Sequence, residues 1–447
     1  MTTQSTSTEE LIERFKSEQF TVGVLGLGYV GLPICLAATR ANLKVVGFDI
    51  DPQKPEMLNN GESYLRHIGS DAIKTMAGSG LFSATSDFSR LNEPDALLIC
   101  VPTPLTAHLT PDLSLVEATA ETIAKYLRPG QLVALESTTY PGTTIEILRP
   151  ILEKSGLKSD QDFFLAFSPE REDPANAHFE TTTIPKVVGA DSPAALAMAN
   201  HLYSRFVSST VPVTSTRIAE AVKLTENIFR SVNIALVNEL KVVFDTMGID
   251  VWEVIDAAKT KPFGYMAFYP GPGLGGHCIP IDPFYLTWKA KEFGIATRFI
   301  ELAGQINSNM PQHVINKLAL ALDEHQRKGL NGSKILMYGI AYKKNVDDMR
   351  ESPALRIIEL LEERGAKVDF YDPYVPVITP TREHAALTGR KSEPWSPDLA
   401  SNYDAVLIIT DHDDVDYAST VESAKLVVDT RNACRKAGVE SDKLVLA

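Results

Sequence analysis

The segment Gly271–Phe284, which reads GPGLGGHCIPIDPF, holds a thiol and a carboxylate in a short run rich in glycine and proline. Cys278 and Asp282 are its two reactive side chains. The prolines that follow Ile279 and Asp282 disfavour helix at those two residues and stiffen the backbone. The preceding glycines let the backbone approach a ligand closely. The pattern favours covalent chemistry at Cys278, provided that a cationic or polar neighbourhood stabilises its thiolate.

The remaining cysteines and the neighbouring histidine carry weaker signals. Cys35, Cys100 and Cys434 lie in or beside apolar patterns, so we expect them to be small buried hydrophobes. The four cysteines are scattered without a CxxC pair, which predicts neither a disulfide framework nor a metal site. His277 has the residue type of a general base, and a structural role is equally open to it.

A second motif predicts dinucleotide binding. GLGYVG supplies Gly26, Gly28 and Gly31 between an apolar strand and a helix, and Asp49 ends the next strand, 23 residues after Gly26. The glycines admit a pyrophosphate at the helix start, and the acid binds the adenosine ribose. With Asp51 nearby and no arginine in FDIDPQK, NAD is favoured over NADP. The alternative is a glycine turn that only packs helix on strand.

Elements of two kinds must position these residues. Apolar runs such as DALLICVPTP, QLVALESTTYPGT and DFFLAFSPE alternate with helical segments, which indicates a mainly parallel, doubly wound sheet. A helical pattern of some thirty residues follows Pro212 and ends at Gly248. The segment GSKILMYGIAYKKNVDDMRESPALRIIELLEERGAKVDFYDPYV then repeats the strand–turn–helix–strand order without GxGxxG. The fold class is therefore α/β, with two Rossmann-like doubly wound domains joined by a long central helix.

Charge and hydropathy exclude some partners. The net charge of −14 argues against nucleic acid and acidic membranes, so local Lys and Arg must capture any anionic ligand. The polar start MTTQSTSTEE has no secretory pattern, and no run of about 18 apolar residues occurs. We expect a soluble, cytoplasmic protein.

Six motifs taken in order resemble one family. GLGYVGLP, CVPTP, ESTTYPGTT, SPER, PGPGLGGHCIPIDPFYL and GIAYKKNVDDMRESPA are similar to those of nucleotide-sugar 6-dehydrogenases of the UDP-glucose/GDP-mannose dehydrogenase superfamily. GGHC resembles the branch acting on UDP-N-acetylhexosamines, with His277 as its marker. The segments GFDID and KPFGYMAFYPGPG look most like UDP-N-acetylglucosamine 6-dehydrogenases.

This resemblance implies an organisation and partners. A polar extension would occupy residues 1–19, an NAD-binding domain 20–212, a central helical region for dimerisation with the cysteine loop 213–328, and a UDP-sugar-binding domain 329–447. The implied cofactor is NAD and the implied substrate is a UDP-sugar. The long helix makes a homodimer the smallest assembly that we expect.

The family's reaction explains the residue types. It oxidises a primary alcohol at C6 to a carboxylate in two hydride transfers, with two NAD⁺ and one water. By resemblance, Cys278 attacks the aldehyde and forms a thiohemiacetal and then a thioester. Lys223 and Asn227, four residues apart on the long helix, would stabilise oxyanions. Without the family, the same two residues fit a solvated helix face.

Further catalytic and binding roles follow from the same resemblance. Asp282 and Thr138 would handle water and protons, and Glu170 would act as acid or base. Pro174 departs from the second glutamate of UDP-glucose enzymes. Implied cofactor contacts are Gly26, Gly28, Tyr29, Val30, Gly31, Asp49, Pro102, Thr103, Ser137, Thr138 and Arg350. Implied substrate contacts are Glu170, Arg171, Lys223, Asn227, Phe268, Tyr269, Gly273, Gly275, Lys343 and Arg431.

Simpler interpretations stay open for several of these positions. Arg171 equally fits a surface salt bridge, Arg350 and Arg431 fit ordinary surface charges, and the two aromatic residues fit core packing. At the level of function, UDP-N-acetylmannosamine and UDP-glucose are alternative substrates. A β-hydroxyacid dehydrogenase or a catalytically inactive NAD-binding scaffold are alternative classes.

Overall fold

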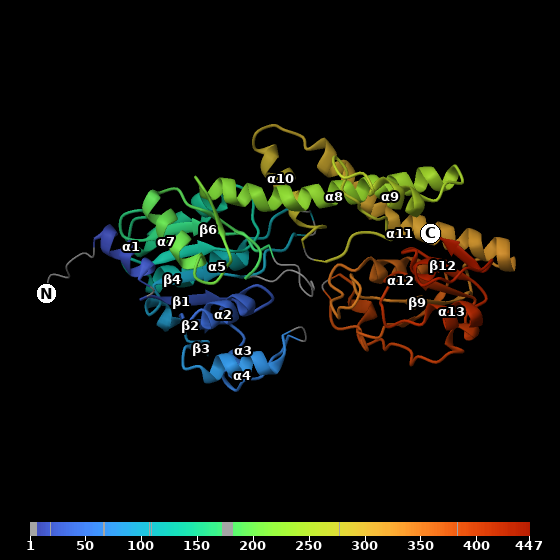
Figure 1. The fold of residues 1–447 in the computed structure, drawn as a ribbon, viewed down its shortest axis with the longest axis horizontal. Coiled ribbons are helices and arrows are strands. Elements are labelled where there is room, and N and C mark those ends of the chain that lie inside the picture. The colour runs from blue at the N-terminus through green and yellow to red at the C-terminus, as the bar shows by residue number, and fades with distance from the viewer. Residues whose placement is uncertain are drawn as a thin grey trace. The chain divides into compact units, whose positions relative to one another are not determined.

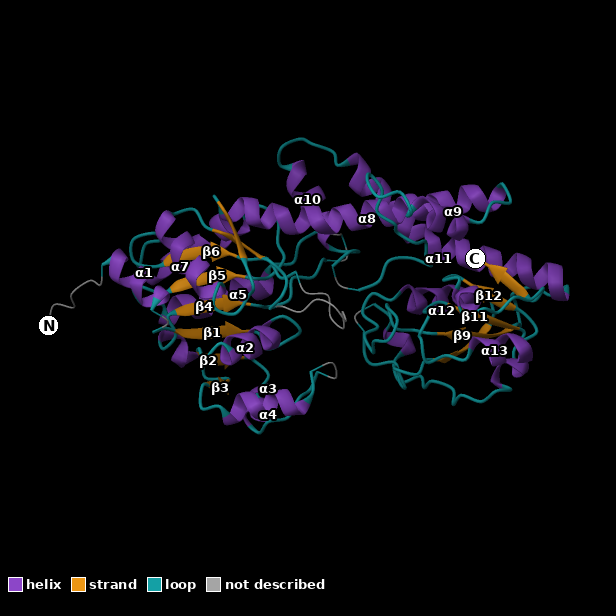
Figure 2. Ribbon diagram, in the orientation of Figure 1, coloured by secondary structure: helices purple, strands orange, loops and turns teal. Residues whose placement is uncertain are grey.

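The computed structural model describes residues 7–17, 19–65, 68–106, 108, 110–171, 182–276, 278–381 and 383–447. The chain divides into two compact units. The first comprises residues 1–226 and 284–295, and the second comprises residues 227–283 and 296–447. Each unit contains a sheet with helices around it, as Figure 2 shows by colour. The α/β prediction with two Rossmann-like domains is confirmed.

Within the described residues, the sheet of the first unit has eight strands in the order β3-β2-β1-β4-β5-β6-β7-β8. Neighbouring strands are parallel except β6 and β7, which are antiparallel. The strands are β1 (Thr21–Leu25), β2 (Lys44–Phe48), β3 (Phe82–Thr85), β4 (Ala96–Ile99), β5 (Leu132–Leu135), β6 (Phe164–Phe167), β7 (Lys186–Gly189) and β8 (Thr210–Val213).

Both faces of this sheet are covered, because side chains alternate along each strand. Val22 and Val24 of β1 join one core with residues of α2 and α7. Leu97 and Ile99 of β4 join a second core with residues of α5. The helices of this unit are α1 (Thr8–Lys16), α2 (Gly31–Arg40), α3 (Gln53–Asn59), α4 (Ser70–Gly78), α5 (Ser114–Tyr126), α6 (Arg149–Leu152) and α7 (Pro193–Tyr203), together with most of α10 (Asp282–Lys291).

The long helix α8 (Thr216–Thr246) confirms the helical prediction for this stretch. It runs from the first unit into the second, and the boundary between the units falls between residues 226 and 227. Figure 1 shows α8 as one continuous helix. Lys223 and Asn227 therefore lie one turn apart in this helix, on either side of that boundary.

The second unit combines helices with a parallel sheet in the order β10-β9-β11-β12-β13. Ile335 and Met337 of β9 face a core shared with α11 and α12, while Leu336 and Tyr338 face a core shared with α13 and α14. Its further elements are α9 (Val251–Ala258), α11 (Arg298–Gln326), β9 (Lys334–Tyr338), α12 (Pro353–Glu363), β10 (Lys367–Tyr371), β11 (Ala405–Ile408), α13 (Tyr417–Ser423), β12 (Val427–Asp429), α14 (Ala433–Lys436) and β13 (Leu444–Leu446).

The two sheets repeat one strand order, since β10-β9-β11-β12-β13 corresponds to β2-β1-β4-β5-β6. The turn after the central strand is also repeated. The N–H of Gly26 donates to the carbonyl of Phe48 at 2.8 Å, and the N–H of Gly339 donates to that of Tyr371 at 2.9 Å. Both glycines have positive φ, 93° and 79°. Positions in one unit can therefore be matched to positions in the other.

Candidate functional site

Three glycines shape the turn between β1 and α2. A Cβ on Gly26 would lie 2.8 Å from the carbonyl oxygen of Cys100, and one on Gly31 would lie 2.0 Å from the carbonyl oxygen of Gly26. A side chain at either position would displace the backbone. A Cβ on Gly28 would meet no atom within 4 Å, so open space lies beside the turn.

The start of α2 adjoins this open space, because the helix begins at Gly31. Tyr29 and Val30 are half-buried and pack against the core below. The first N–H groups of a helix have no partners within the helix, and the helix dipole favours negative charge there. The turn, the open space and the helix start together fit the pyrophosphate of NAD.

Asp49 is fixed at the end of β2 and is 6 % exposed. Its Oδ2 accepts hydrogen bonds from the N–H of Leu27 at 2.9 Å and from Nζ of Lys54 at 3.0 Å. Its Oδ1 accepts one from the N–H of Asp51. The carboxylate thus lies against the glycine turn, where the sequence predicts that it binds a ribose.

The loops after β4 and β5 are tied together at the carboxyl ends of these parallel strands. The Thr103 hydroxyl donates to the carbonyl of Thr138 at 2.7 Å, and the Ser137 hydroxyl donates to that of Val101 at 2.6 Å. Pro102 is exposed between them. In doubly wound sheets this edge binds ligands, so four predicted cofactor residues (Pro102, Thr103, Ser137 and Thr138) share one edge.

A buried ionic cluster lies beside Glu170. Nζ of Lys186 lies 2.7 Å from Oε2 of Glu136 and 3.5 Å from Oε2 of Glu170, and the Tyr203 hydroxyl donates to Glu136 at 2.5 Å. Burial opposes the charge on Lys186, but Glu136 and Glu170 raise its pKa, so the ammonium stays charged. Lys186 therefore holds Glu170 in place.

Neither Lys186 nor Glu136 was singled out from the sequence. The available signal was a lysine at the start of the apolar strand KVVGA and a glutamate at the end of the apolar strand LVAL. Charged groups in such places are rarely buried unless they are paired.

We expect Lys186→Met to lower the free energy of unfolding by about 3–5 kcal/mol, because it leaves the buried Glu136 carboxylate without its counter-charge. Urea denaturation followed by circular dichroism measures the loss. Arg90→Met is the control: the Arg90–Glu93 pair is exposed, and removing it should cost at most about 1 kcal/mol. Equal, small losses in both variants would contradict the structural role of Lys186.

Arg171 forms a bidentate ion pair. Its Nη2 lies 2.6 Å from Oε1 of Glu226, its Nε donates to Oε2 at 3.3 Å, and its Nη1 donates to the carbonyl of Pro185. These contacts match the salt-bridge alternative. They connect Arg171, which follows Glu170, to Glu226, the last residue of α8 within the first unit.

The second unit brings Asn227, Cys278 and Asp282 together. Nδ2 of Asn227 donates to Oδ2 of Asp282 at 2.5 Å, and both side chains are buried. The N–H of Asp282 donates to the carbonyl of Cys278 at 2.8 Å. Lys223, also buried, precedes Asn227 by one helical turn on α8. His277 lies outside the described residues, as does Pro174.

One local prediction here is wrong. Asp282 is the first residue of α10, although it precedes a proline. The steric conflict with proline applies within a helix, whereas Pro283 here occupies the first turn, where no N–H donor is required. The carboxylate of Asp282 therefore stands at the start of a helix, which favours negative charge.

A chain of buried amides holds the beginning of the cysteine segment. Asn238 accepts a hydrogen bond from the N–H of Gly271 at 3.0 Å and donates to Asn307 at 2.9 Å, and Asn307 donates to the carbonyl of Ser231. Sequence reasoning missed both asparagines. Their only signal was a polar side chain within an apolar helical pattern.

The later glycines of the segment pack against Tyr342. A Cβ on Gly275 would lie 2.7 Å from Cβ of Tyr342, and one on Gly276 would lie 2.9 Å from its ring. The N–H of Gly276 donates to the carbonyl of Arg350 at 3.1 Å. Gly273 has a φ of 142°. The cysteine segment and the segment that holds Arg350 are thus packed together.

Two aromatic residues predicted at the substrate pocket pack against helices of the second unit. Phe268 meets Phe229 edge to face, with ring centroids 5.8 Å apart. Tyr269 stacks on Trp252 at 5.6 Å and donates its hydroxyl to Asp256. These contacts fit the alternative that Phe268 and Tyr269 pack in a core better than the prediction that they line the substrate pocket.

Three cations that the sequence predicts to contact ligands lie on loops of the second unit. Arg431 donates to the carbonyl of Ile409 at 2.9 Å, and a Cβ on Gly271 would lie 2.5 Å from its Nη1. Arg350 forms an ion pair with Asp348, and Lys343 is half-buried. Arg431 is therefore held beside the cysteine segment rather than on an open surface.

The remaining predictions concern cysteines, metals and membranes. Cys35, Cys100 and Cys434 are buried, as predicted, and burial raises the pKa of each thiol, whereas Cys278 is half-buried. In the part of the chain that the structure describes, no cluster of three or more His, Cys, Asp or Glu suits a metal ion. None of the described helices is long and apolar enough to cross a membrane.

Three family models match the chain in order. They are the NAD-binding domain of the UDP-glucose/GDP-mannose dehydrogenase family over residues 20–207, the central domain over 217–309 and the UDP-binding domain over 336–436. The matches place the glycine turn in the first, Cys278 in the second and Arg431 in the third.

Individual proteins are similar over most of their length. A UDP-N-acetyl-D-glucosamine 6-dehydrogenase of Pseudomonas aeruginosa is 37% identical over 380 residues, which are 82% of this chain and 88% of that protein. A UDP-N-acetyl-D-mannosamine dehydrogenase of Pyrococcus horikoshii is 35% identical over 93% of this chain and 96% of that protein. A solved structure of UDP-D-ManNAc dehydrogenase from Pyrococcus horikoshii has a TM-score of 0.84 at 32% identity and covers 95% of this chain and 98% of its own.

Proposed function

Because this chain belongs to the UDP-glucose/GDP-mannose dehydrogenase family, whose members are NAD-dependent enzymes, we propose that it is a UDP-N-acetylglucosamine 6-dehydrogenase. It oxidises the C6 hydroxymethyl group to a carboxylate with two NAD⁺ and one water. The contact that supports this chemistry best is the buried hydrogen bond between Asn227 and Asp282, next to the Cys278 backbone. It joins an amide and a carboxylate, and the N–H of the same Asp282 donates to the carbonyl of Cys278.

The mechanism assigns each step to a residue of the chain. The glycine turn between β1 and α2 and Asp49 would hold NAD⁺, which would supply the hydride acceptor, with one NAD⁺ used for each of the two hydrides that C6 loses. The Cys278 thiolate adds to the aldehyde carbon and forms a thiohemiacetal, and loss of the second hydride leaves a thioester. Water then breaks the carbon–sulfur bond, which releases the carboxylate and restores the thiol. Lys223 and Asn227 stabilise the negative oxygen at C6.

Proton transfer is assigned to Asp282, Glu170 and Thr138. Asp282 accepts a hydrogen bond from Asn227, which orients its carboxylate. Asp282 positions the attacking water and takes its proton as the thioester is hydrolysed. Glu170 and Thr138 serve the proton transfers of the alcohol oxidation.

The choice of UDP-N-acetylglucosamine rests on the segments GFDID and KPFGYMAFYPGPG and on the similarity to the Pseudomonas aeruginosa enzyme, whereas GGHC indicates only the UDP-N-acetylhexosamine branch. A second candidate is UDP-N-acetylmannosamine, which the high coverage by the Pyrococcus horikoshii protein favours. The two sugars differ at one stereocentre, C2.

Parallel assays with UDP-N-acetylglucosamine, UDP-N-acetylmannosamine and UDP-glucose test the proposal. We expect the highest kcat/KM with the first, and two NADH formed for each sugar consumed, because the alcohol loses four electrons. NADH absorbance and chromatography of the UDP-sugar give both numbers. One NADH per sugar would indicate a hydroxyacid-type reaction, and none with any sugar would indicate an inactive scaffold.

We also propose that the chain forms a homodimer through α8. Phe229, Leu236 and Val243 follow one another at intervals of seven residues and are 47%, 51% and 45% exposed. Residues at this spacing form one stripe along a helix. A second copy of the chain would cover this stripe.

Leu236→Asp places a charge in the centre of the stripe, so we expect the dimer to dissociate into monomers at micromolar concentration. Light scattering coupled to size-exclusion chromatography measures the mass. Leu115→Asp is the control, since Leu115 is similarly exposed (41%) but belongs to α5 and not to the stripe on α8. A dimer that survives Leu236→Asp would rule out this interface.

A further inference from the structure

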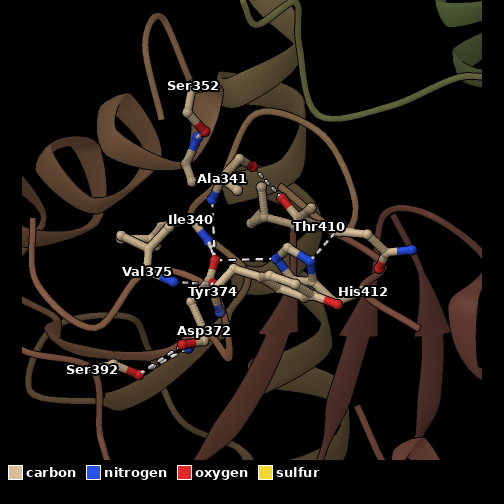
Figure 3. Close-up of polar contacts among 12 residues, drawn as sticks. Ile340, Ala341, Ser352, Asp372, Tyr374, Val375, Ser392, Thr410 and His412 are labelled. Carbon is tan, nitrogen blue, oxygen red and sulfur yellow. Dashed lines mark hydrogen bonds and ion pairs between the residues drawn. The ribbon is translucent and has the colours of Figure 1, made fainter. Parts of the chain in front are cut away.

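Asp372, the acid that follows β10, has a buried histidine partner, which its counterpart Asp49 in the first sheet lacks among the described residues. Asp372 follows β10 as Asp49 follows β2, and Oδ2 of each accepts from the N–H after the turn glycine, Ile340 at 2.7 Å and Leu27 at 2.9 Å. Oδ2 of Asp372 also accepts from the N–H of Ala341 at 3.1 Å and lies 3.1 Å from Nε2 of His412. Figure 3 shows these contacts converging on one carboxylate. Asp372 therefore braces its own glycine turn and also holds the side chain of His412.

His412 is fixed in one tautomer by its two neighbours. Its Nδ1 accepts the N–H of Asn345 at 2.9 Å, so Nε2 carries the proton and donates to Asp372. The side chains of both His412 and Asp372 are fully buried, and the ring of Tyr374 lies 4.9 Å from the imidazole. Although burial works in the opposite direction, the bonds from His412 and from backbone N–H groups hold the pKa of Asp372 below its ordinary value.

His412 lies at a place in the second unit that can be matched to a residue of the first unit. In β-strand register, Ile408 of β11 matches Ile99 of β4, so His412 corresponds to Thr103 of the first unit. In the first unit, the loop after β4 carries predicted cofactor contacts, among them Thr103. In the second unit the same place holds an imidazole that joins the end of β10 to the loop after β9.

The loop that His412 holds is pinned at further points. Asn345 has a φ of 60°, a left-handed conformation that asparagine tolerates. Its side chain exchanges hydrogen bonds with Asp413, at 2.5 Å to the carboxylate and 3.0 Å from the N–H. Asp413 also pairs with Lys344, and the Thr410 hydroxyl donates to the carbonyl of Ala341.

This loop, residues 341–351, carries Lys343 and Arg350, and its Tyr342 and Arg350 contact the cysteine segment. We propose that His412, oriented by Asp372, is a positioning residue for the UDP-sugar site, because it locks the loop 341–351 in the conformation that presents Lys343. The inference rests on the proposed function for the role of Lys343, and on the matched UDP-binding domain for the ligand.

His412→Ala tests the inference with UDP alone as the probe. The variant leaves the Asn345 N–H without its acceptor and removes one of the three hydrogen bonds to Oδ2 of Asp372, so we expect the UDP dissociation constant measured by calorimetry to rise about tenfold or more. The KM for the UDP-sugar should rise more than kcat falls, and NAD affinity should stay unchanged. Hydrogen exchange of residues 341–351 should become faster.

Two further variants separate positioning from general stability. His412→Gln keeps one acceptor and one donor and should restore at least half of the lost binding free energy. His384→Ala removes a second histidine–carboxylate pair of the same unit, with Glu359 at 2.9 Å, and should leave UDP affinity unchanged. Asp413→Ala loosens the loop from an exposed side chain and should weaken UDP binding about threefold without unfolding risk.

Wild-type UDP affinity in His412→Ala, or an equal loss in His384→Ala, would overturn the inference. Failure of the wild-type protein to bind UDP would overturn it as well. If the wild-type protein binds UDP but does not oxidise UDP-N-acetylglucosamine, the proposed function fails while the role of His412 stands.

Discussion

Cys278→Ser abolishes sugar oxidation while NAD binding persists. Serine keeps the shape of the side chain but is a far weaker nucleophile at neutral pH, so the aldehyde is no longer captured. We expect kcat to fall by at least about a thousandfold. NAD affinity, measured by calorimetry, should not change, because the glycine turn and Asp49 belong to the first unit and Cys278 to the second.

A matched control uses a cysteine that the structure buries. Cys35→Ala removes a thiol from the core that packs against the glycine turn, where burial raises the pKa of this thiol. This variant should retain most of the activity. If Cys278→Ser kept turnover within about tenfold of the wild-type rate, the thioester route would be wrong.

Lys223→Ala has the second largest expected effect. Lys223 is 8% exposed and precedes Asn227 by one turn of the same helix. Removing a preorganised positive charge from a developing oxyanion costs about a hundredfold or more in kcat. Steady-state kinetics with saturating NAD and UDP-sugar measure the loss.

Lys241 provides the comparison for this variant. It lies on the same helix and is 3% exposed, and burial lowers its pKa. Lys241→Ala should leave kcat within about twofold of wild type once the folded fraction is corrected for. Similar losses in both variants would assign the effect of Lys223 to helix stability instead of charge.

The parts of the molecule that depend on local sequence could be predicted. Gly26, Gly31 and Asp49 lie within one strand–turn–helix–strand unit, so their spacing already specifies the turn that the structure shows. The helix α8 follows from apolar residues at helical spacing. Cys278 stood out because an irregular, glycine-rich loop surrounds it.

Pairings between distant residues could not be predicted, because no local pattern encodes them. Lys186 meets Glu136 across 50 residues of sequence, and Asn238 meets Asn307 across 69. Each partner alone reads as an ordinary polar residue. The packing of Tyr269 on Trp252 similarly depends on how the loop after α9 returns to that helix.

The interleaved order of the two units has a consequence for synthesis of the chain. Residues 284–295 belong to the first unit but follow residues 227–283 of the second. Within them, the Tyr285 hydroxyl donates to the carbonyl of Thr103 at 2.6 Å, and Lys289 pairs with Glu146. A nascent chain therefore cannot complete its amino-terminal sheet unit until residue 295 has left the ribosome, and a fragment cut at residue 226 lacks the segment that closes it.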